Sequence, residues 1–215
     1  MAKSSRTIFQ FGALVMLLIV FPAVSWYYLN SGLQYRKAAM EELDDYGTFP
    51  NAPWTFADGS VISPSFLQGK MILAHVLPAA GQELDEQFGH TLQKLHHQFD
   101  ERNELVFLSL VPGDSAQVAQ RAEQFKTTYS LNDGAQIFFL QVGKDKLEDI
   151  RSRILQPRED IDQDVLFLLT DTSATIRRYY DVREESEIKR LVEHIALLLP
   201  LKKDRELIFK REAEK

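Results

Sequence analysis

The side chains to consider for chemistry in this chain are histidines, carboxylates and serines. None of the 215 residues is a cysteine. The absence of cysteine excludes disulfides, thiolate nucleophiles, iron–sulfur clusters and thiolate metal sites. Ser109 and Ser115 show neither a nucleophile elbow nor a Ser/His/Asp arrangement. The residue pattern therefore does not indicate covalent catalysis.

Three histidines, His90, His96 and His97, fall in a stretch whose apolar residues have helical spacing. Two ligands that share one ion on a helix need a spacing of three or four residues. His90 and His97 lie about 10 Å apart along a helix axis, and the adjacent His96 and His97 point about 100° apart. We therefore expect solvated histidines here rather than a metal site.

His75 lies in the apolar run Met71–Leu77, near the carboxyl end of a predicted strand, where the active sites of open α/β sheets gather. We favour a buried histidine with a satisfied hydrogen bond over a catalytic one. A separate group of carboxylates offers oxygen ligands for calcium, but it lacks the glycine and the register of a calcium loop, which favours a solvated loop. This acidic loop contains Glu159, Asp160, Asp162 and Asp164. A metal-binding module that uses His75 or this loop remains an alternative.

An apolar span from Ile8 to Leu29 is long enough to cross a hydrocarbon core of about 30 Å as a helix. Lys3 and Arg6 precede the span, and no acidic residue appears before Glu41. Basic residues in front of a first span hold that end in the cytoplasm, so we expect the rest of the chain to be exported. This pattern predicts a single-pass inner-membrane protein with its C-terminal domain in the periplasm.

The end of the apolar span leaves two interpretations open. Residues 23–25, with the sequence AVS, have the small-x-small form of a processing site, so a cleaved signal peptide is one alternative. Residues 26–28, with the sequence WYY, would form an interfacial aromatic belt if the segment stays in the membrane. We favour the uncleaved anchor.

After Pro50 the chain alternates between strand and helix patterns. Aromatic residues around Asp58 and Gly59 indicate a short hairpin. Apolar runs at Met71–Leu77 and Glu104–Val111 flank a helical pattern and predict a βαβ unit. Further along, the patterns predict helices at Ser115–Tyr129, 144–155 and 184–199. They predict a strand at Ala135–Val142 and a two-stranded hairpin at Val165–Tyr180.

The order of these elements predicts the fold class. Two parallel crossovers followed by a hairpin and a helix are typical of a thioredoxin-like sheet, and the absence of a Gly-rich fingerprint disfavours a Rossmann fold. We predict an α/β thioredoxin-like domain with a mixed central sheet, flanking helices and an N-terminal hairpin, preceded by one transmembrane helix. The predicted divisions are a cytoplasmic tip with the anchor (1–30), a juxtamembrane helix or linker (31–48), the domain (49–200) and a charged tail expected to be helical (201–215).

Several segments in this order resemble the SCO/SenC family, membrane-anchored thioredoxin-like proteins that deliver copper to cytochrome oxidase or maintain its thiols. The resemblance rests on the anchor followed by GLQYRKAAMEEL, then FADGSVISPSFLQGKMILAHV, then VLFLLTDTSATIRRYYD and a final helix. It covers nearly the whole chain from about Ile8, and its most characteristic part is IRRYYD at Ile176–Asp181.

The family's copper site uses two cysteines, separated by three residues at the strand-to-helix turn, and a histidine just before the late strand. Alignment without gaps places the cysteine positions at Gly81 and Asp85 and the histidine position at Gln163, or at Asp162 with a slip of one residue. Copper prefers sulfur or imidazole ligands, which none of these residues offers. The resemblance therefore implies a vacated site, and we expect neither a cofactor nor a metal.

These observations lead to an expected function. The net charge of −6 and the lack of a concentrated basic surface argue against nucleic acid as a partner. We expect a non-enzymatic, membrane-anchored binding or assembly factor for a membrane or periplasmic protein, and the resemblance suggests the respiratory oxidase. The alternative is a copper chaperone or a thiol–disulfide or electron-transfer protein of the SCO/SenC type that acts through a rebuilt site.

The expected binding surface is an exposed rim around the vacated turn, because loops on a rigid scaffold often carry function. Its expected members are His75, Pro78 and Gln82. We also expect Gln82 and Asp85 to be exposed, so that substitutions there change the free energy of unfolding by no more than about 0.5 kcal/mol.

Overall fold

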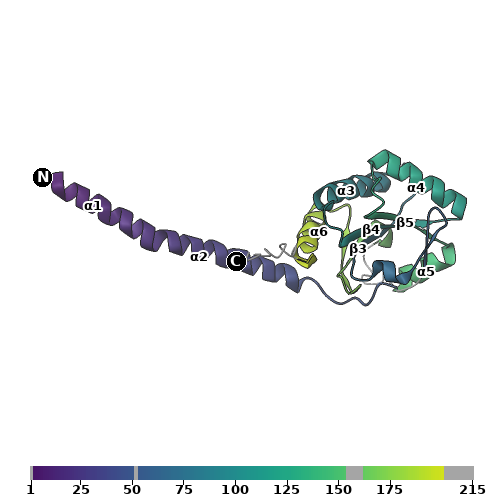
Figure 1. The fold of residues 1–215 in the computed structure, drawn as a ribbon, viewed down its shortest axis with the longest axis horizontal. Coiled ribbons are helices and arrows are strands. Elements are labelled where there is room, and N and C mark those ends of the chain that lie inside the picture. Colours follow the sequence, from purple (N-terminus) through teal and green to yellow (C-terminus); the bar gives the residue numbers. More distant parts are fainter. Residues whose placement is uncertain (1, 51–52, 154–161, 201–215) are drawn as a thin grey trace, which may run out of the picture. The chain divides into compact units, whose positions relative to one another are not determined.

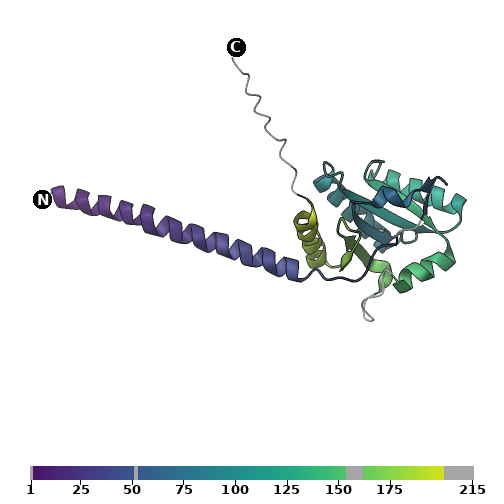
Figure 2. The same cartoon turned by 60° about the horizontal axis from the view of Figure 1, so that its bottom comes forward.

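The computed structural model describes residues 2–50, 53–153 and 162–200, and the chain divides into two compact units between Leu43 and Asp44. The first unit is helical, with α1 at Ala2–Val15, a π-helical turn at Met16–Val20 and α2 at Phe21–Glu41. Figure 2 shows these elements as one continuous rod. The wider π turn, in which the Phe21 N–H bonds to the Met16 carbonyl, lies directly before Pro22, whose ring disrupts regular helical hydrogen bonding.

The helical stretch Phe9–Glu41 is long and apolar enough to cross a membrane, and none of its most apolar window is buried by the protein. Large apolar side chains such as Phe9, Leu17 and Trp26 are exposed along it. The predicted N-terminal apolar helix is therefore confirmed as a candidate membrane span. The helix continues past Leu29 to Glu41, so most of the predicted juxtamembrane segment is helical.

The second unit is built on a seven-stranded mixed sheet with the order β2-β1-β5-β4-β3-β6-β7. The central strands β3, β4 and β5 are parallel. On one side β1 pairs antiparallel with β5, and on the other β6 pairs antiparallel with β3 and β7 pairs antiparallel with β6. The bounds are Trp54–Phe56 (β1), Val61–Ile62 (β2), Met71–Val76 (β3), Leu105–Pro112 (β4), Ile137–Val142 (β5), Leu166–Thr170 (β6) and Ile176–Asp181 (β7).

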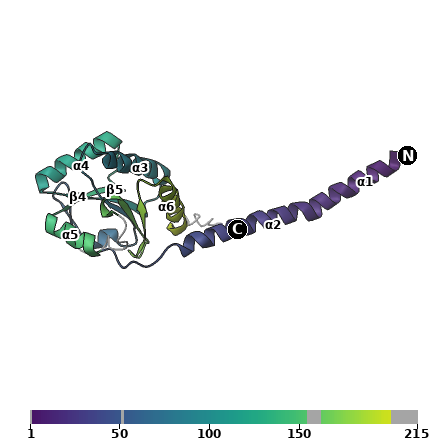
Figure 3. The same cartoon turned by 180° about the vertical axis from the view of Figure 1, so that it is seen from behind.

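Helices cover both faces of this sheet. One face packs against α3 (Glu83–Phe99), α4 (Ser115–Tyr129) and α6 (Glu185–Leu198). The other packs against α5 (Lys144–Arg153) and Phe49, and Trp54 of β1 is buried on that side. Figures 1 and 3 show α3 and α4 on one side of the strands and α5 on the other. Because both faces are covered, β3 reads as a fully buried apolar run rather than as an alternating one.

The predicted thioredoxin-like arrangement is confirmed. The hairpin around Asp58 and Gly59 pairs β1 with β2, the βαβ unit joins β3 and β4 through α3, and the late hairpin pairs β6 with β7. The structure adds a short helical turn at Pro64–Leu67 and the pairing of β1 with β5, neither of which was predicted. The predicted helical tail, residues 201–215, lies outside the described residues.

A short segment before the domain, Asp44–Phe49, lies along the edge of the sheet, and we call it the strap. Its backbone bonds to the start of β7 and to the turn before it, through Tyr46 N–H to the Ile176 carbonyl (3.0 Å) and Phe49 N–H to the Ala174 carbonyl (2.8 Å). The rings of Tyr46 and Tyr179 also meet edge to face. The strap, most of which we predicted to belong to the linker, therefore packs with the domain.

Helices α3 and α4 approach each other closely at Gly89. A Cβ atom placed on Gly89 would lie 2.4 Å from the ring of Tyr129, which is far inside van der Waals contact. Both residues are buried, so neither the ring nor the helix backbone can move away freely. Glycine at this position therefore sets the distance between the two helices.

This close approach makes Gly89→Ala a sensitive test of the packing. Alanine normally stabilises a helix relative to glycine, but here overpacking should lower the free energy of unfolding by about 1–3 kcal/mol. Urea denaturation of a fragment beginning at Asp44 measures the effect. In a Tyr129→Ala background the same substitution should become neutral or stabilising, and an equal loss in both backgrounds would contradict the assigned contact.

Candidate functional site

The strand-to-helix turn that carries the vacated positions runs from Leu77, after β3, to Gln82, before α3. Leu77 N–H bonds to the Leu110 carbonyl of β4 (2.8 Å), which continues the pairing of the strands into the turn. Gly81 adopts a positive φ of +73°, a conformation that side-chain-bearing residues rarely adopt. The first predicted cysteine position is therefore one that strongly favours glycine.

Asp85, the second vacated position, forms an ion pair with Arg121 of α4. The Asp85 side chain is 7% exposed and that of Arg121 is 15% exposed, so the pair is largely removed from water. The other carboxylate oxygen accepts the Gly81 N–H at 3.2 Å, and Arg121 donates a second hydrogen bond to the Pro78 carbonyl at 3.0 Å. This ion pair ties both ends of the turn to α4.

The expectation that Asp85 belongs to an exposed rim is wrong. Its residue exposure is only 5%, because the first turn of α3 faces α4 across the sheet surface and Arg121 closes the gap between them. Gln82 is exposed as predicted, and Pro78 is half-buried. The accessible part of the turn is therefore Ala79–Glu83.

His75 is also not a rim residue, because it is buried on β3 with only 1% exposure. Its ring stacks on Phe88 of α3 with the ring centroids 4.5 Å apart, and it meets Phe167 of β6 edge to face. Its Nε2 lies 3.5 Å from the Ser109 hydroxyl, and within the described residues its Nδ1 has no hydrogen-bond partner. Of the hydrogen bonding predicted for a buried His75, the structure shows only this long contact with Ser109.

The protonation state of His75 follows from this environment. Burial, followed by the nearby positive charge of Arg121, lowers the pKa of His75 to about 3. The imidazole is therefore neutral at physiological pH. The contacts of the ring with Phe88 and Phe167 assign it to packing.

Gln163, the third vacated position, begins the short 3₁₀ turn Gln163–Val165 before β6. The antiparallel register of β3 with β6 pairs Ala74 with Leu168, so the residues preceding β6 stand beyond the carboxyl end of β3. The structure therefore brings Gly81 and Asp85 into direct contact and places Gln163 at the same end of the sheet. Among the described residues, no hydrogen bond joins Gln163 to either of them.

The other histidines predicted to be solvated have mixed environments. His96 bonds through Nε2 to the Asp133 carboxylate at 2.9 Å, and this hydrogen bond lowers the pKa of Asp133. The ring of His90 meets that of Tyr129 edge to face, whereas His97 is exposed. His96 thus connects α3 to the loop that precedes β5. The sequence, in which His96 and His97 are simply adjacent, does not indicate this role.

The two described carboxylates of the acidic loop form local contacts. Asp162 accepts the Asp164 N–H at 3.1 Å, and Asp164 pairs with Arg151 of α5. Glu159 and Asp160 lie outside the described residues. In the part of the chain that is described, no group of three or more histidine, aspartate or glutamate side chains is placed to share a metal ion.

Sequence reasoning missed two buried polar pairs. Arg121 follows the apolar position Val118 by three residues, so its place beside the apolar stripe of α4 is the only sequence signal that it faces inward. The second pair joins His194 of α6 to Tyr180 of β7, with the hydroxyl 2.7 Å from Nδ1. Both pairs connect residues far apart in the chain.

Comparisons with known proteins agree with this fold. No protein-family model matches the chain, and no curated protein sequence matches it. Among solved structures, the chain is similar to a SCO1/SenC family lipoprotein of Bacillus anthracis, with 15% identity, a TM-score of 0.58, and coverage of 73% of this chain and 95% of that one.

Two further solved structures show the same arrangement. The soluble domain of Sco1 from Bacillus subtilis has 16% identity and a TM-score of 0.54, covering 72% of this chain and 92% of that one. BsSco, a member of the Sco family of cytochrome c oxidase assembly proteins, has 15% identity and a TM-score of 0.56, covering 74% and 96%. At these identities the similarity establishes the fold, which is the thioredoxin-like fold of SCO/SenC proteins.

The ion pair predicts an asymmetry between neighbouring turn residues. Asp85→Ala and Arg121→Ala should each lower the free energy of unfolding by roughly 3–5 kcal/mol, because each leaves a buried charge without its partner. The double variant should lose less than the sum of the two. Gln82→Ala, the exposed control, should stay within about 0.5 kcal/mol of the wild type. Equal effects at positions 82 and 85 in chemical denaturation would contradict the assignment.

Proposed function

We propose that this chain is a membrane-anchored binding or assembly factor whose thioredoxin-like domain faces the periplasm and acts without copper or thiol chemistry. The similarity to SCO/SenC structures supports the type of domain, and the candidate span supports the anchor. The orientation rests on Lys3 and Arg6, which precede the span and favour a cytoplasmic N-terminus in an inner membrane.

The observation that carries the proposal is the ion pair between Asp85 and Arg121 at the place where the resemblance puts a metal-binding and redox-active cysteine. Each oxygen of the Asp85 carboxylate already accepts a hydrogen bond, one from Arg121 and the other from the Gly81 N–H, and the side chain is only 7% exposed, so it is poorly placed to act as a metal ligand. The chain has no thiolate to replace it, and copper binds weakly to isolated carboxylate oxygen. The turn is thus suited to hold a shape rather than to transfer electrons.

The proposed contact surface is the exposed stretch Ala79–Gln82. Its backbone is anchored at Pro78 by Arg121 and at Gly81 by Asp85, so little conformational entropy would be lost when a partner binds. BsSco is described as a member of a family of cytochrome c oxidase assembly proteins. By analogy, we propose that the partner here is a membrane protein of the respiratory oxidase apparatus.

Copper binding distinguishes this proposal from the copper-chaperone alternative. The purified full-length protein should bind neither Cu(I) nor Cu(II) stoichiometrically at micromolar concentration, as measured by competition with a chromogenic chelator. The variant Gly81→Cys/Asp85→Cys/Gln163→His should gain binding, although its stability should fall because it places a side chain at positive φ and removes the ion pair. Tight binding by the wild type that disappears in His75→Ala would overturn the proposal.

Partner recovery tests the surface and the orientation together. A membrane-impermeant crosslinker applied to the periplasmic side of inner membranes should capture a partner with the wild-type chain. Gln82→Arg should reduce this capture at least fivefold, whereas Asn132→Arg, an exposed change at the other end of the sheet, should leave it unchanged. Loss of capture with Asn132→Arg alone would place the surface elsewhere, and the absence of crosslinks from this side would contradict the orientation.

A further inference from the structure

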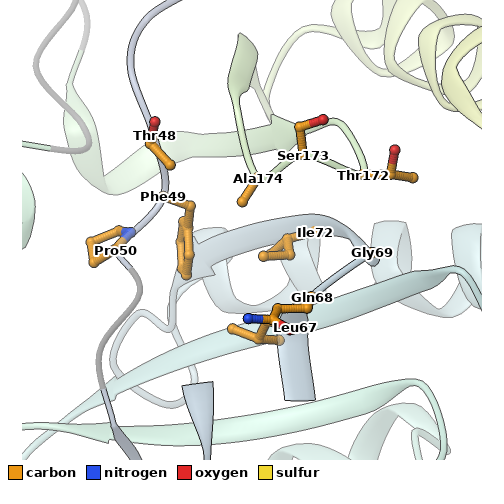
Figure 4. A pocket seen from close by; sticks show the side chains of 10 residues that line it. All are labelled: Thr48, Phe49, Pro50, Leu67, Gln68, Gly69, Ile72, Thr172, Ser173 and Ala174. Atoms are coloured by element: carbon orange, nitrogen blue, oxygen red, sulfur yellow. The ribbon is translucent and has the colours of Figure 1, made fainter. Parts of the chain in front are cut away.

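A hollow of about 310 Å³ lies at the amino end of β3, the end of the sheet opposite to Gly81 and Asp85. Three segments form its walls: the end of the strap with Pro50, the turn before β3, and the turn between β6 and β7 (Figure 4). The lining residues are Thr48, Phe49, Pro50, Leu67, Gln68, Gly69, Ile72, Thr172, Ser173 and Ala174. The proposed function does not use this hollow.

The lining is apolar inside and polar but uncharged around the rim. Figure 4 shows the side chains of Phe49, Ile72 and Ala174 directed toward one another, with Leu67 below them. Phe49 and Ile72 are 2% and 0% exposed, so packing holds both in place and the accessible surface of the hollow comes mainly from the other lining residues. The hydroxyl and amide groups of the rim come from threonine, serine and glutamine, and none of the ten lining residues is ionisable.

Hydrogen bonds hold the walls in place without any ligand. The Phe49 N–H bonds to the Ala174 carbonyl at 2.8 Å, which joins the strap to the β6–β7 turn. The Asp171 carboxylate accepts the Ser173 N–H at 2.8 Å and the Thr175 N–H at 3.0 Å, which fixes that turn. The turn keeps Ala174 at a positive φ of 62°, an unfavourable conformation for alanine that directs its methyl group into the hollow. The hollow is therefore preformed.

We propose that this hollow binds a single alkyl chain whose head group is uncharged. Its volume is at the lower end of the range of small-ligand pockets, which suits one chain rather than a ring system with several substituents. An ionised head group would find no opposite charge among the lining residues, whereas a hydroxyl or an ester could bond to Thr48, Gln68 or Ser173.

The position of the hollow in the chain favours a membrane-derived amphiphile. Thr48 follows Glu41, the last residue of the candidate membrane-spanning helix, by seven residues, and follows Leu29, the last residue of its apolar span, by nineteen. Alkyl chains of this chemistry have two sources, the tails of bilayer lipids and free neutral amphiphiles such as long-chain alcohols. The apolar surface of the lining would recognise the alkyl chain from either source.

Trp54 is a built-in reporter for this site. The chain has two tryptophans, Trp26 in the span and Trp54 in β1, so Trp26→Phe leaves a single emitter in the domain. The indole of Trp54 stacks on Phe49 with ring centroids 5.8 Å apart, and Phe49 lines the hollow. A ligand that displaces or contacts Phe49 should therefore change the emission of Trp54.

The test uses the full-length Trp26→Phe protein in amphipol, titrated with 1-octanol. We expect a saturable change in Trp54 emission. Gln68→Phe and Ser173→Phe, two substitutions of exposed rim residues that fill the hollow, should each weaken the apparent affinity at least tenfold. Gln82→Phe, the control at the opposite end of the sheet, should leave it unchanged. An unchanged circular dichroism spectrum identifies the variants that are folded.

A second arm separates the two sources of the chain. The same protein is placed in phosphatidylcholine nanodiscs that contain a lipid with a doxyl-labelled tail, which quenches tryptophan on contact. Quenching of Trp54 that Gln68→Phe relieves assigns the hollow to a bilayer lipid tail, whereas octanol binding without such quenching assigns it to a free amphiphile. A linear, unsaturable octanol response, or equal affinities in the Gln68→Phe and Gln82→Phe variants, would overturn the proposal.

Discussion

The ion pair between Asp85 and Arg121 organises the end of the domain where β3 and β4 finish. Burying two charges costs several kcal/mol of hydration, and a buried pair is tolerated only when its remaining groups are also bonded. Here Gly81 supplies a donor to the carboxylate and the Pro78 carbonyl accepts from the guanidinium, while the buried Nε of Arg121 has no hydrogen-bond partner among the described residues. The pair thereby fixes the turn, the start of α3 and the middle of α4 relative to one another, and the positive φ of Gly81 is compatible with this arrangement.

The sequence was sufficient to predict the order and type of the elements. Apolar runs such as Met71–Val76 and helical periodicities such as Ser115–Tyr129 depend on local spacing, which determines which face is buried. The pairing of β1 with β5 and the docking of the strap on β7 could not be predicted in this way. Both involve partners far apart in the chain, and short irregular segments carry no periodic pattern that would reveal them.

The site was predicted less completely than the fold. Alignment with the resembling family located the turn, and Gly81 and Asp85 do lie in contact there. The burial of Asp85 could not be inferred, because it depends on Arg121, which lies 36 residues further along the chain and belongs to another helix. His75 illustrates the same limit, because its apolar context predicted burial but its stacking on Phe88 depends on where α3 crosses β3. The same crossing leaves its Nδ1 without a hydrogen-bond partner among the described residues.

The strap has a consequence for the exposed edge of the sheet. An exposed edge strand offers a row of unpaired backbone groups on which strands of other molecules can assemble. At the start of β7 the strap occupies these groups, with Ile176 donating its N–H to the Gly47 carbonyl and accepting from Tyr46. At the opposite edge β2 is only two residues long, too short to template an intermolecular sheet. The segment that leads from the candidate membrane-spanning helix into the domain therefore also shields this part of the sheet edge from pairing with another chain.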